Sequence, residues 1–391
     1  MSFIEKLLSG VDVEWKTLCD VATLRRGRVM SKEYLADHSG QYPVYSSQTT
    51  NDGEIGKIDT YDFDGEYITW TTDGANAGTV FYRKGKFSIT NVCGSIKINQ
   101  EIKLDHKYLF YWLTIESYKH VYSGMGNPKL MSHQVEKIPV PIPCPDNPKK
   151  SLEIQTEIVR ILDTFSAMTA ELTAELSIRK KQYNYYRDQL LSFKDEKFEW
   201  KKLEDVAEYS KTRISFELLD KMNYVGVDNL LQNRAGKTES NYLPTSGNLT
   251  RYSEGDILIG NIRPYLKKIW QADRIGGTNG DVLVIRLKDE AVNAQYLYQI
   301  LADERFFEYN MQHAKGAKMP RGNKDKIMEY RFQIPKNLDE QARIVSILDK
   351  FEKLTNSLTE GLPREIELRQ KQYEYYRDLL YSFSKPKEVE A

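Results

Sequence analysis

The tripeptide Glu-Trp-Lys occurs twice in the chain, at residues 14–16 and 199–201. A glutamate and a lysine at this spacing match the last part of a nuclease site, which also needs an upstream aspartate at a strand end to share the metal ion. Both tripeptides stand at the start of the same repeated pattern of elements, described below. We therefore favour packing at a strand edge as their role, with a nuclease site as the alternative.

Other catalytic constellations are not found in the sequence. It has neither a GxxxxGK phosphate loop followed by Ser or Thr nor a GxGxxG fingerprint. It also lacks the Asp/Asn-Pro-Pro-aromatic tetrapeptide with which an amino-methyltransferase grips its target base. The histidines are far apart, and Cys19, Cys93 and Cys144 form no CxxC pair, so neither a metal site nor a disulfide is expected. We expect this chain to hold no cofactor and no metal ion.

A local concentration of positive charge points to binding instead. Residues 313–326 contain five basic side chains and one acid, Asp325, and their glycines and proline predict a loop. In such a loop, backbone amides and Lys or Arg can approach phosphate closely, while Asn and Arg can reach base edges. The matching stretch in the first half of the chain is 124–133. We interpret both stretches as candidate DNA contacts.

Two polar turns and two short basic stretches complete the candidate interface. The turns lie at 71–76 and 261–268, and the basic stretches at 25–28 and 211–213. Outside the cluster at 315–326, a solvated surface without a ligand is the competing interpretation for each residue. The candidate DNA-binding residues are Arg25, Arg26, Arg28, Thr72, Asn76, Asn127, Lys129, Lys211, Arg213, Asn261, Arg263, Lys267, Lys315, Lys318, Arg321, Asn323 and Lys324.

These candidates lie on a pattern that the chain uses twice. Each half begins at a Glu-Trp-Lys strand and continues through a variable region to a short helix, at 108–113 and 296–301. A strand ending in proline follows, and then a long helix. The pattern therefore indicates duplication of a whole domain, not a solenoid with a period of roughly 20–50 residues.

The two halves differ in their middle parts. Residues 66–82 and 256–270 both predict a strand, a polar turn broken by Gly or Pro, and a second strand. The turn residues themselves are unlike. A shared scaffold with different loops is typical of a protein that recognises two different targets.

Each half ends in a long helical pattern, over residues 155–193 and 341–383. Apolar residues recur at alternating steps of three and four, which predicts a coiled-coil seam, with an ordinary long core helix as the alternative. Each helix would have roughly 39 residues and a length of about 58 Å. The second half carries four extra residues near Gly361, a stutter that keeps the seam in phase. Pro363 is expected to kink this helix or to restart it.

A short echo at the N-terminus suggests how the chain is closed. Leu7-Leu8-Ser9 before the first Glu-Trp-Lys resembles Leu190-Leu191-Ser192 before the second. The chain thus begins and ends with the tail of the same helix. We expect a circular arrangement with a pseudo-twofold axis between the halves.

Composition limits the class of protein. With 391 residues, 40% hydrophobic and 29% charged, the chain is expected to be soluble and to form two or more domains. No run of eighteen apolar residues exists and the N-terminus lacks a signal-peptide core, so we predict a cytoplasmic protein without membrane contact. The formal net charge is zero, so any surface for nucleic acid must be local.

The duplicated motifs resemble the specificity subunit of Type I restriction–modification enzymes. The resemblance rests on RKKQYNYYRDQLLSF at 179–193 with RQKQYEYYRDLLYSF at 369–383, and on the EWKxLxDVA starts. It also rests on the spaced Gln, Ile-Val, Ile-Leu-Asp and Phe of 155–165, repeated at 341–351. The match covers essentially the whole chain, and every segment occurs twice in the expected order.

This resemblance implies an α+β fold of two pseudo-repeated target-recognition domains joined by two long antiparallel coiled-coil helices. The recognition domains would span 1–150 and 197–337, and the spacer helices 151–196 and 338–385. Each domain would read one half of a split, asymmetric DNA sequence, and the helices would fix the unread gap.

The resemblance also implies that this subunit is non-catalytic. Adenine-N6 methylation and ATP-dependent cleavage would belong to methyltransferase subunits, two of them, and to restriction subunits docked on the specificity subunit. S-adenosylmethionine, ATP and Mg would bind in those partners. Two alternatives stay open from the residues alone: a nuclease that uses the Glu-Trp-Lys tripeptides, and a coiled-coil scaffold whose globular parts bind protein.

Overall fold

The computed structural model describes residues 3–124, 126–192, 198–357 and 360–383. The chain divides into two compact units. Unit 1 comprises residues 1–169 and 369–391, and unit 2 comprises 170–368. The divisions fall inside helices α6 (Pro148–Leu190) and α12 (Gly361–Leu380), so each of these helices contributes residues to both units. The domain boundaries proposed from the sequence remain a prediction.

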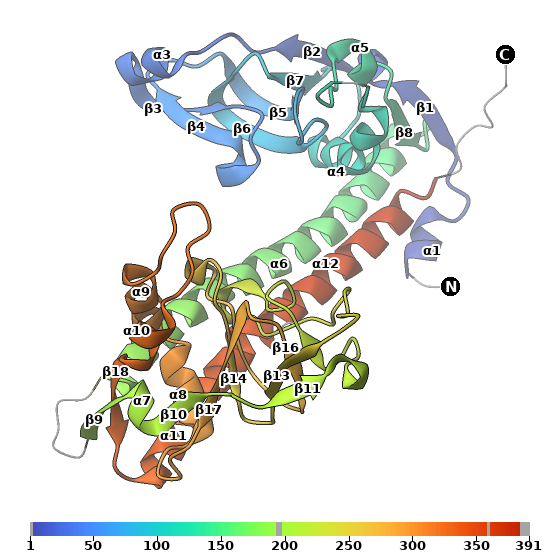
Figure 1. Ribbon diagram of the computed structural model, residues 1–391. Coiled ribbons are helices and arrows are strands. Elements are labelled where there is room, and N and C mark those ends of the chain that lie inside the picture. The colour runs from blue at the N-terminus through green and yellow to red at the C-terminus, as the bar shows by residue number, and fades with distance from the viewer. Residues whose placement is uncertain (1–2, 125, 193–197, 358–359, 384–391) are drawn as a thin grey trace. The chain divides into compact units, whose positions relative to one another are not determined.

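Unit 1 is built around a six-stranded sheet with the order β2-β7-β5-β6-β3-β4. All its neighbouring strands are antiparallel except β3 and β6. Its strands are β2 (Ala22–Arg26), β3 (Ser39–Tyr45), β4 (Glu54–Ile58), β5 (Phe63–Thr71), β6 (Val80–Ile89) and β7 (Cys93–Ile98). The helices of the unit before α6 are α1 (Phe3–Leu8), α2 (Leu18–Val21), α3 (Lys32–Asp37), α4 (His106–Glu116) and α5 (Ser132–Val135) (Figure 1).

Unit 2 replaces the large sheet with two sheets of four strands, ordered β10-β17-β14-β15 and β11-β13-β16-β12. The strands are β10 (Ala207–Tyr209), β11 (Arg213–Ser215), β12 (Tyr224–Val225), β13 (Asn248–Tyr252), β14 (Ile257–Gly260), β15 (Ile269–Gln271), β16 (Gly276–Thr278) and β17 (Val282–Leu287). The short helices of unit 2 are α7 (Leu203–Val206), α8 (Ala294–Leu301), α9 (Glu304–Gln312) and α10 (Lys324–Met328). The predicted strand–turn–strand segments are confirmed as β5–β6 and β14–β15.

The frame around these sheets is the same in both units. The Glu-Trp-Lys strand β1 (Val13–Thr17) pairs with β8 (Pro139–Pro143), and β9 (Phe198–Lys202) pairs with β18 (Arg331–Pro335). All four strands lie in two-stranded antiparallel sheets, and β8 and β18 end in proline as the sequence predicts. The α+β class and the duplication are therefore confirmed.

One buried glutamine in each unit joins the short helix to the long one. Gln155 of α6 accepts a hydrogen bond from the Asp105 amide, 2.8 Å away, and donates to the Lys103 carbonyl at 3.3 Å. Gln341 of α11 (Leu338–Asn356) repeats both bonds with Asn293 and Ala291, at 2.7 and 3.0 Å. Both glutamine side chains are fully buried, so each of these bonds is shielded from water.

A buried tyrosine adds a third common contact. The hydroxyl of Tyr108 on α4 donates to the Pro141 carbonyl of β8, at 3.0 Å. Tyr296 on α8 makes the same bond to Gln333 of β18, at 3.1 Å. Together with the glutamines, these tyrosines hold the short helix, the proline strand and the long helix in one relation in both units.

The long helical patterns are confirmed in part. The first pattern forms one helix of 43 residues, α6, whereas the second is divided into α11 and α12, with 19 and 20 residues. Of the two outcomes expected at Pro363, a kink or a restart, the structure shows the restart. Proline has no amide proton and a φ suited to a first helical turn, and Pro363 stands in the first turn of α12.

The seam residues of these helices pack as the periodicity predicts. Within unit 1, Phe165 of α6 stacks on Tyr376 of α12, with ring centroids 5.3 Å apart. Within unit 2, Tyr186 of α6 stacks on Phe351 of α11, at 5.6 Å. Figure 1 shows α6 and α12 side by side. No helix among the described residues is both long enough and apolar enough to cross a membrane.

Candidate nucleic-acid interface

In unit 2 the two loops that the sequence singles out are held together by backbone hydrogen bonds. The basic loop folds back on itself, because the Lys315 and Arg321 amides and carbonyls bond to each other at 2.9 and 2.8 Å. The returning strand of this loop then pairs with the turn after β14. We call the contact between residues 260–268 and 315–322 the unit 2 junction.

Two further bonds fix the register of the unit 2 junction. The Arg263 amide donates to the Pro320 carbonyl at 2.7 Å, and the Gly322 amide donates to the Asn261 carbonyl at 3.1 Å. Ile262 and Arg321 form an isolated bridge at the same place. The side chains on both loops are thus presented from a defined backbone.

Unit 1 has the same arrangement with different residues. The Gly74 amide donates to the Pro128 carbonyl at 3.0 Å, and the Leu130 amide donates to the Thr72 carbonyl at 2.9 Å. Tyr122 pairs with Lys129 at 2.8 and 3.0 Å, as Lys315 does with Arg321. We call the contact between residues 71–79 and 122–130 the unit 1 junction. Sequence comparison of the halves suggested matching loops, and the structure brings each pair together.

The basic side chains of the unit 2 junction lie at the surface. Lys315, Lys318 and Lys324 are exposed, and Arg321 is exposed while its guanidinium contacts Asp281 at 2.8 Å. An exposed ion pair of this kind contributes little to stability, so the Arg321 side chain can exchange Asp281 for a phosphate at small cost. The positive charge predicted for this loop is therefore accessible.

The predicted extent of the basic loop needs one correction. Residues 324–326 are helical, because α10 begins at Lys324. The side-chain oxygen of Asn323 caps this helix, accepting from the Asp325 and Lys326 amides at 3.2 and 3.4 Å. Asn is a preferred N-cap residue, so the Gly-Asn-Lys sequence ends the loop and begins a helix. The side-chain carbonyl oxygen of Asn323 is therefore already hydrogen-bonded within the protein.

The turn on the other side of the unit 2 junction has a constrained backbone. Arg263 and Lys267 have φ angles of 54° and 51°, on either side of the short 3-10 turn Pro264–Leu266. Positive φ is uncommon for residues other than glycine and is often found at functional sites. Arg263 and Tyr265 are exposed, whereas Lys267 is half-buried and forms an ion pair with Glu304.

The candidates at the unit 1 junction differ in exposure. Asn127 and Lys129 are exposed, Asn76 is half-buried, and the Lys129 ammonium is 3.9 Å from Asp73. Thr72 is fully buried, and its hydroxyl donates to Asp73 at 2.6 Å. A buried threonine supports the turn and leaves no surface of its own for a ligand.

Arg26 is the link between the β2 arginines and the unit 1 junction. Its guanidinium donates to the Thr72 hydroxyl at 3.2 Å and to the Asn91 carbonyl. Arg28 is paired with Asp62 at 3.0 Å, and the Arg25 guanidinium lies 5.0 Å from the Phe63 ring centre. The structure thus brings Arg26 to the junction and leaves Arg25 and Arg28 with partners at Phe63 and Asp62, where β5 begins.

Lys211 and Arg213 are not brought to the unit 2 junction by any contact. Lys211 is exposed and lies 3.9 Å from Glu208, while Arg213 on β11 donates to the Thr250 hydroxyl at 3.0 Å. They remain isolated candidates, Arg213 on β11 and Lys211 in the segment between β10 and β11.

Sequence reasoning missed a polar site beneath the unit 2 junction. Asn310 on α9 is 1% exposed, and neither polar atom of its side chain has a partner among the described residues. A Cβ atom placed on Gly322 would lie 2.6 and 2.7 Å from the Oδ1 atoms of Asn310 and Asn261. Unit 1 has the buried Leu130 at the matching position. An asparagine within a helix gives no sequence signal for such a role.

The Glu-Trp-Lys tripeptides lie on β1 and β9, in agreement with strand packing. Each lysine is 3.3 Å from the glutamate of its own tripeptide, and Lys201 also contacts Asp289 at 3.0 Å. Over the described ranges, no group of three or more His, Cys, Asp or Glu side chains has the arrangement of a metal site.

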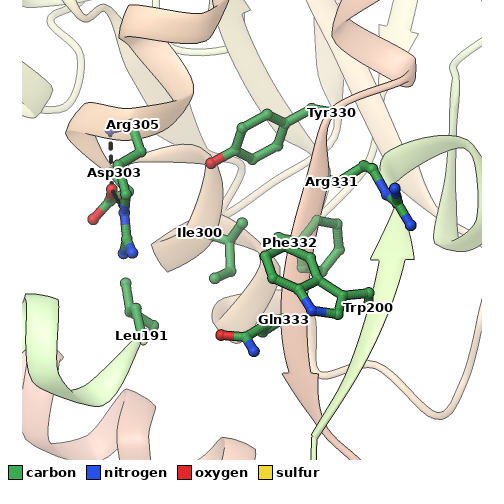
Figure 2. Close-up of a pocket in the computed structure, with 9 residues that line it drawn as sticks. All are labelled: Leu191, Trp200, Ile300, Asp303, Arg305, Tyr330, Arg331, Phe332 and Gln333. Atoms are coloured by element: carbon green, nitrogen blue, oxygen red, sulfur yellow. Dashed lines mark hydrogen bonds and ion pairs between the residues drawn. The ribbon is translucent and has the colours of Figure 1, made fainter. Parts of the chain in front are cut away.

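A small pocket of about 100 Å³ opens beside the second tripeptide (Figure 2). Trp200 is 61% exposed there, whereas Trp15 of unit 1 packs on Trp112 with centroids 5.6 Å apart. Among the described residues that line the pocket, the one acid is Asp303, which is paired with Arg305 at 2.7 Å; Figure 2 shows a dashed line between these two residues. The pocket follows from a smaller residue, Ile300, at the position of Trp112 in the repeat.

Comparison with known proteins gives a consistent family. The model of the "Type I restriction modification DNA specificity domain" matches residues 10–179 and 195–368. The chain is 36% identical, over its whole length and 99% of the relative, to the specificity subunit of the type I restriction enzyme EcoR124I/EcoR124II from Escherichia coli. It is 32% identical to a putative type I specificity subunit from Mycoplasma pneumoniae, with 96% of this chain and 98% of the relative covered.

The fold also has a counterpart among solved structures. The crystal structure of a type I restriction–modification system S subunit from M. genitalium matches with a TM-score of 0.61. The match covers 98% of this chain and all of that one, at 14% identity. At this identity the match speaks for the fold alone.

Proposed function

Because the chain belongs to the type I restriction–modification DNA specificity family, we propose that it reads a DNA sequence in two separate parts, one with each unit. Members of this family are specificity subunits and do not carry out catalysis themselves. The family assignment favours this function over the two alternatives from the sequence, a nuclease and a coiled-coil scaffold that binds protein. The proposal assigns the DNA surface to the two junctions and the docking of partner subunits to the helical segments.

The observation that carries the proposal is one junction built twice with unlike side chains. The strand returning from the loop carries Asn127-Pro128-Lys129 in unit 1 and Met319-Pro320-Arg321 in unit 2. The same backbone bonds present both tripeptides, so the difference lies in the groups that can meet DNA. Asparagine pairs well with adenine in the major groove, and unit 2 has Met319 where unit 1 has Asn127, so the two units offer different groups to a base. Two unlike half-sites are the expected consequence.

The basic side chains around each junction would grip phosphates and set the orientation of the unit. Phosphate contacts fix the register of a protein on the duplex but carry no direct sequence information. Lys315, Lys318 and Arg321 would take this role in unit 2, and Lys129 in unit 1, since all four are exposed. The net charge of zero is low for a protein that binds DNA alone, so partner subunits would contribute part of the phosphate contacts.

Replacing Lys318 and Arg321 together by alanine is expected to weaken DNA binding and its dependence on salt. Each lost phosphate contact lowers the slope of log affinity against log salt by about 0.9 for duplex DNA. Two lost contacts would lower it by roughly 1.8. Titration of DNA with the chain and its methyltransferase subunits at several salt concentrations measures this slope.

The matched control is replacement of Lys149 and Lys150 by alanine, which removes the same charge from two exposed residues at the start of α6. The control should keep the original slope. An unaltered slope in the Lys318 and Arg321 variant would place the unit 2 junction away from the phosphates.

Methyltransferase subunits would dock on the helical segments, one on each unit. Each unit has a pair of adjacent tyrosines in a T-shaped arrangement, Tyr185 with Tyr186 at 5.5 Å and Tyr375 with Tyr376 at 5.3 Å. Tyr185 and Tyr375 are 62% and 65% exposed. Tyrosine is enriched among residues that dominate binding energy at interfaces. Two equal patches fit two copies of one partner, with restriction subunits joining the assembly afterwards.

The double variant Tyr185→Ser, Tyr375→Ser is expected to bind methyltransferase subunits at least about fivefold more weakly at each site, because a central tyrosine typically contributes more than about 1 kcal/mol. Each single variant should lose one of two bound copies, which native mass spectrometry would count. Tyr242→Ser is the control, since Tyr242 is 68% exposed and lies outside these helices. Full occupancy in the double variant would rule out this docking site.

S-adenosylmethionine, ATP and Mg would be bound by the partner subunits, not by this chain. The long helices would set the gap between the half-sites in this scheme. DNA half-sites read by paired domains are commonly about one helical turn, roughly 34 Å, apart.

A further inference from the structure

Unit 1 carries a second polar loop that the sequence analysis did not select. Residues 46–53, Ser-Ser-Gln-Thr-Thr-Asn-Asp-Gly, connect β3 to β4, and residues 49–52 are exposed. Asn51, Asp52 and Gly53 have φ angles of 51°, 50° and 81°. Two consecutive non-glycine residues in the left-handed region are uncommon and persist only where the surroundings enforce them.

Hydrogen bonds close this loop at its base. The Ser46 amide donates to the Gly53 carbonyl at 2.8 Å, and the Gln48 side chain donates to the Glu54 carbonyl at 2.8 Å. The Thr90 hydroxyl donates to the Ser46 hydroxyl at 2.9 Å. The ends of the loop are thus fixed, and its exposed tip consists of hydroxyl, amide and carboxylate groups.

A buried arginine holds the left-handed turn from beneath. Arg83 of β6 is 7% exposed, donates to the Asp52 carbonyl, and has its guanidinium 3.6 and 4.5 Å from the ring centres of Tyr45 and Phe81. Among the residues that the structure describes, no carboxylate forms an ion pair with it. Burying a charge in this way is costly. The Arg83 guanidinium is held at the base of the turn, where it fixes the Asp52 carbonyl.

The loop is connected to the unit 1 junction through residues 89–91. The Thr90 amide donates to the Tyr45 carbonyl at 2.9 Å, and the Arg28 amide donates to the Ile89 carbonyl at 3.2 Å. Two residues after Ile89, the Asn91 carbonyl accepts a hydrogen bond from the Arg26 guanidinium. The same guanidinium donates to the Thr72 hydroxyl of the junction. A short chain of contacts therefore connects the 46–53 loop with the candidate DNA surface.

Unit 2 contains a counterpart. Asn233 and Arg234 have φ angles of 55° and 65° in the turn before Gly236, and Asn233 is exposed. The Arg234 amide donates to the Lys267 carbonyl of the unit 2 junction at 3.0 Å. Different sequences in the two units thus hold a left-handed asparagine in a loop that is connected to each junction.

We propose that the loops at 46–53 and 232–236 are second base-reading elements, with Asn51 and Asn233 as specificity-determining residues and Arg83 as a positioning residue for the first loop. An asparagine amide can donate to N6 and accept at N7 of adenine, which suits direct readout in the major groove. The inference rests on the proposed function, since it concerns how each unit discriminates bases.

The test is the methylation pattern of the holoenzyme carrying Asn51→Gly or Asn233→Gly. Glycine adopts positive φ without strain, so each change removes the amide and keeps the backbone. Loss of a bidentate contact should reduce discrimination at one base position about 10- to 100-fold. Asn51→Gly should relax one position in one half of the sequence, and Asn233→Gly one position in the other half. Single-molecule sequencing of modified bases measures both, and each variant serves as the control of the other.

Arg83→Gln tests the positioning role. It should relax the same position as Asn51→Gly with the rest of that half-site still read, whereas a general structural defect would weaken every position of the half-site together. Discrimination unchanged in both asparagine variants, a uniform loss of affinity without altered discrimination, or changes in the same half would overturn the inference. Failure of the proposed function is distinguishable, because the unmodified holoenzyme would then not methylate a two-part sequence at all.

Discussion

Exchanging residues 197–337 for the corresponding segment of another family member is expected to change one half of the methylated DNA sequence and to leave the other half as it was. The exchanged segment contains the whole unit 2 junction and both strands of the β9–β18 pair. It leaves the unit 1 junction untouched. Methylation-sensitive sequencing of cells that express the chimera with the methyltransferase subunits reports both halves at once.

The contacts between the exchanged segment and the retained helices α6 and α11 determine which donor segments can assemble with the rest of the chain. Gln341 of α11 needs a backbone amide and a carbonyl at the positions of Asn293 and Ala291, which any sequence with the same helix start supplies. Arg187 of α6 needs side-chain acceptors at the positions of Gln299 and Asp303. A donor with apolar residues there is the control that should fail to assemble. A chimera that alters both halves, or neither, would contradict the division of reading between the units.

Arg187→Met is expected to cost unit 2 about 3–5 kcal/mol, as loss of one partner of a buried charge pair usually does. The Arg187 side chain is 3% exposed and lies 3.0 Å from the Asp303 carboxylate and 3.0 Å from the Gln299 side-chain oxygen. Its removal leaves these acceptors buried with fewer donors. For a unit of this size, the unfolding temperature should fall by roughly 10 °C, which calorimetry would detect as a separate transition.

The internal repeat supplies the control for this experiment. Arg377 stands at the matching place in the repeated motif, and its guanidinium contacts Asp378, the next residue, at 2.8 Å. The Asp378 side chain is 61% exposed, so Arg377→Met should cost less than about 1 kcal/mol. Equal losses in the two variants would show that the Arg187 network is not what stabilises unit 2.

The frame of the fold could be predicted because it depends on repeated, local signals. The seam residues Phe165 and Phe351, the proline strands and the Glu-Trp-Lys starts recur at fixed places in both halves. Packing of these residues follows from periodicity, which is a property of short windows of sequence. Pro363 likewise has a local effect, and the helix begins again around it.

The candidate site could be predicted only in outline. The basic composition of 315–326 indicated a surface loop, but its pairing with residues 260–268 depends on contacts between distant segments. Thr72 was selected as a contact, yet it is buried because the unit 1 junction covers it. Asn310 and Arg83 lay on elements that looked ordinary, and only their burial reveals that Arg83 holds the Asp52 carbonyl and that Asn310 has polar atoms without a partner among the described residues.

Unit 1 takes residues from both ends of the chain, and this has a consequence for synthesis on the ribosome. Leu380 and Tyr381 belong to its core, and the Tyr381 hydroxyl donates to the Tyr108 carbonyl. At about 5–20 residues per second, residues 170–368 take roughly ten to forty seconds to make. During that interval unit 1 lacks the core residues Leu380 and Tyr381. Unit 2, in contrast, consists of one uninterrupted segment of the chain. The N-terminal unit of a nascent chain would therefore finish folding last, and a truncated product would carry an unfinished unit 1.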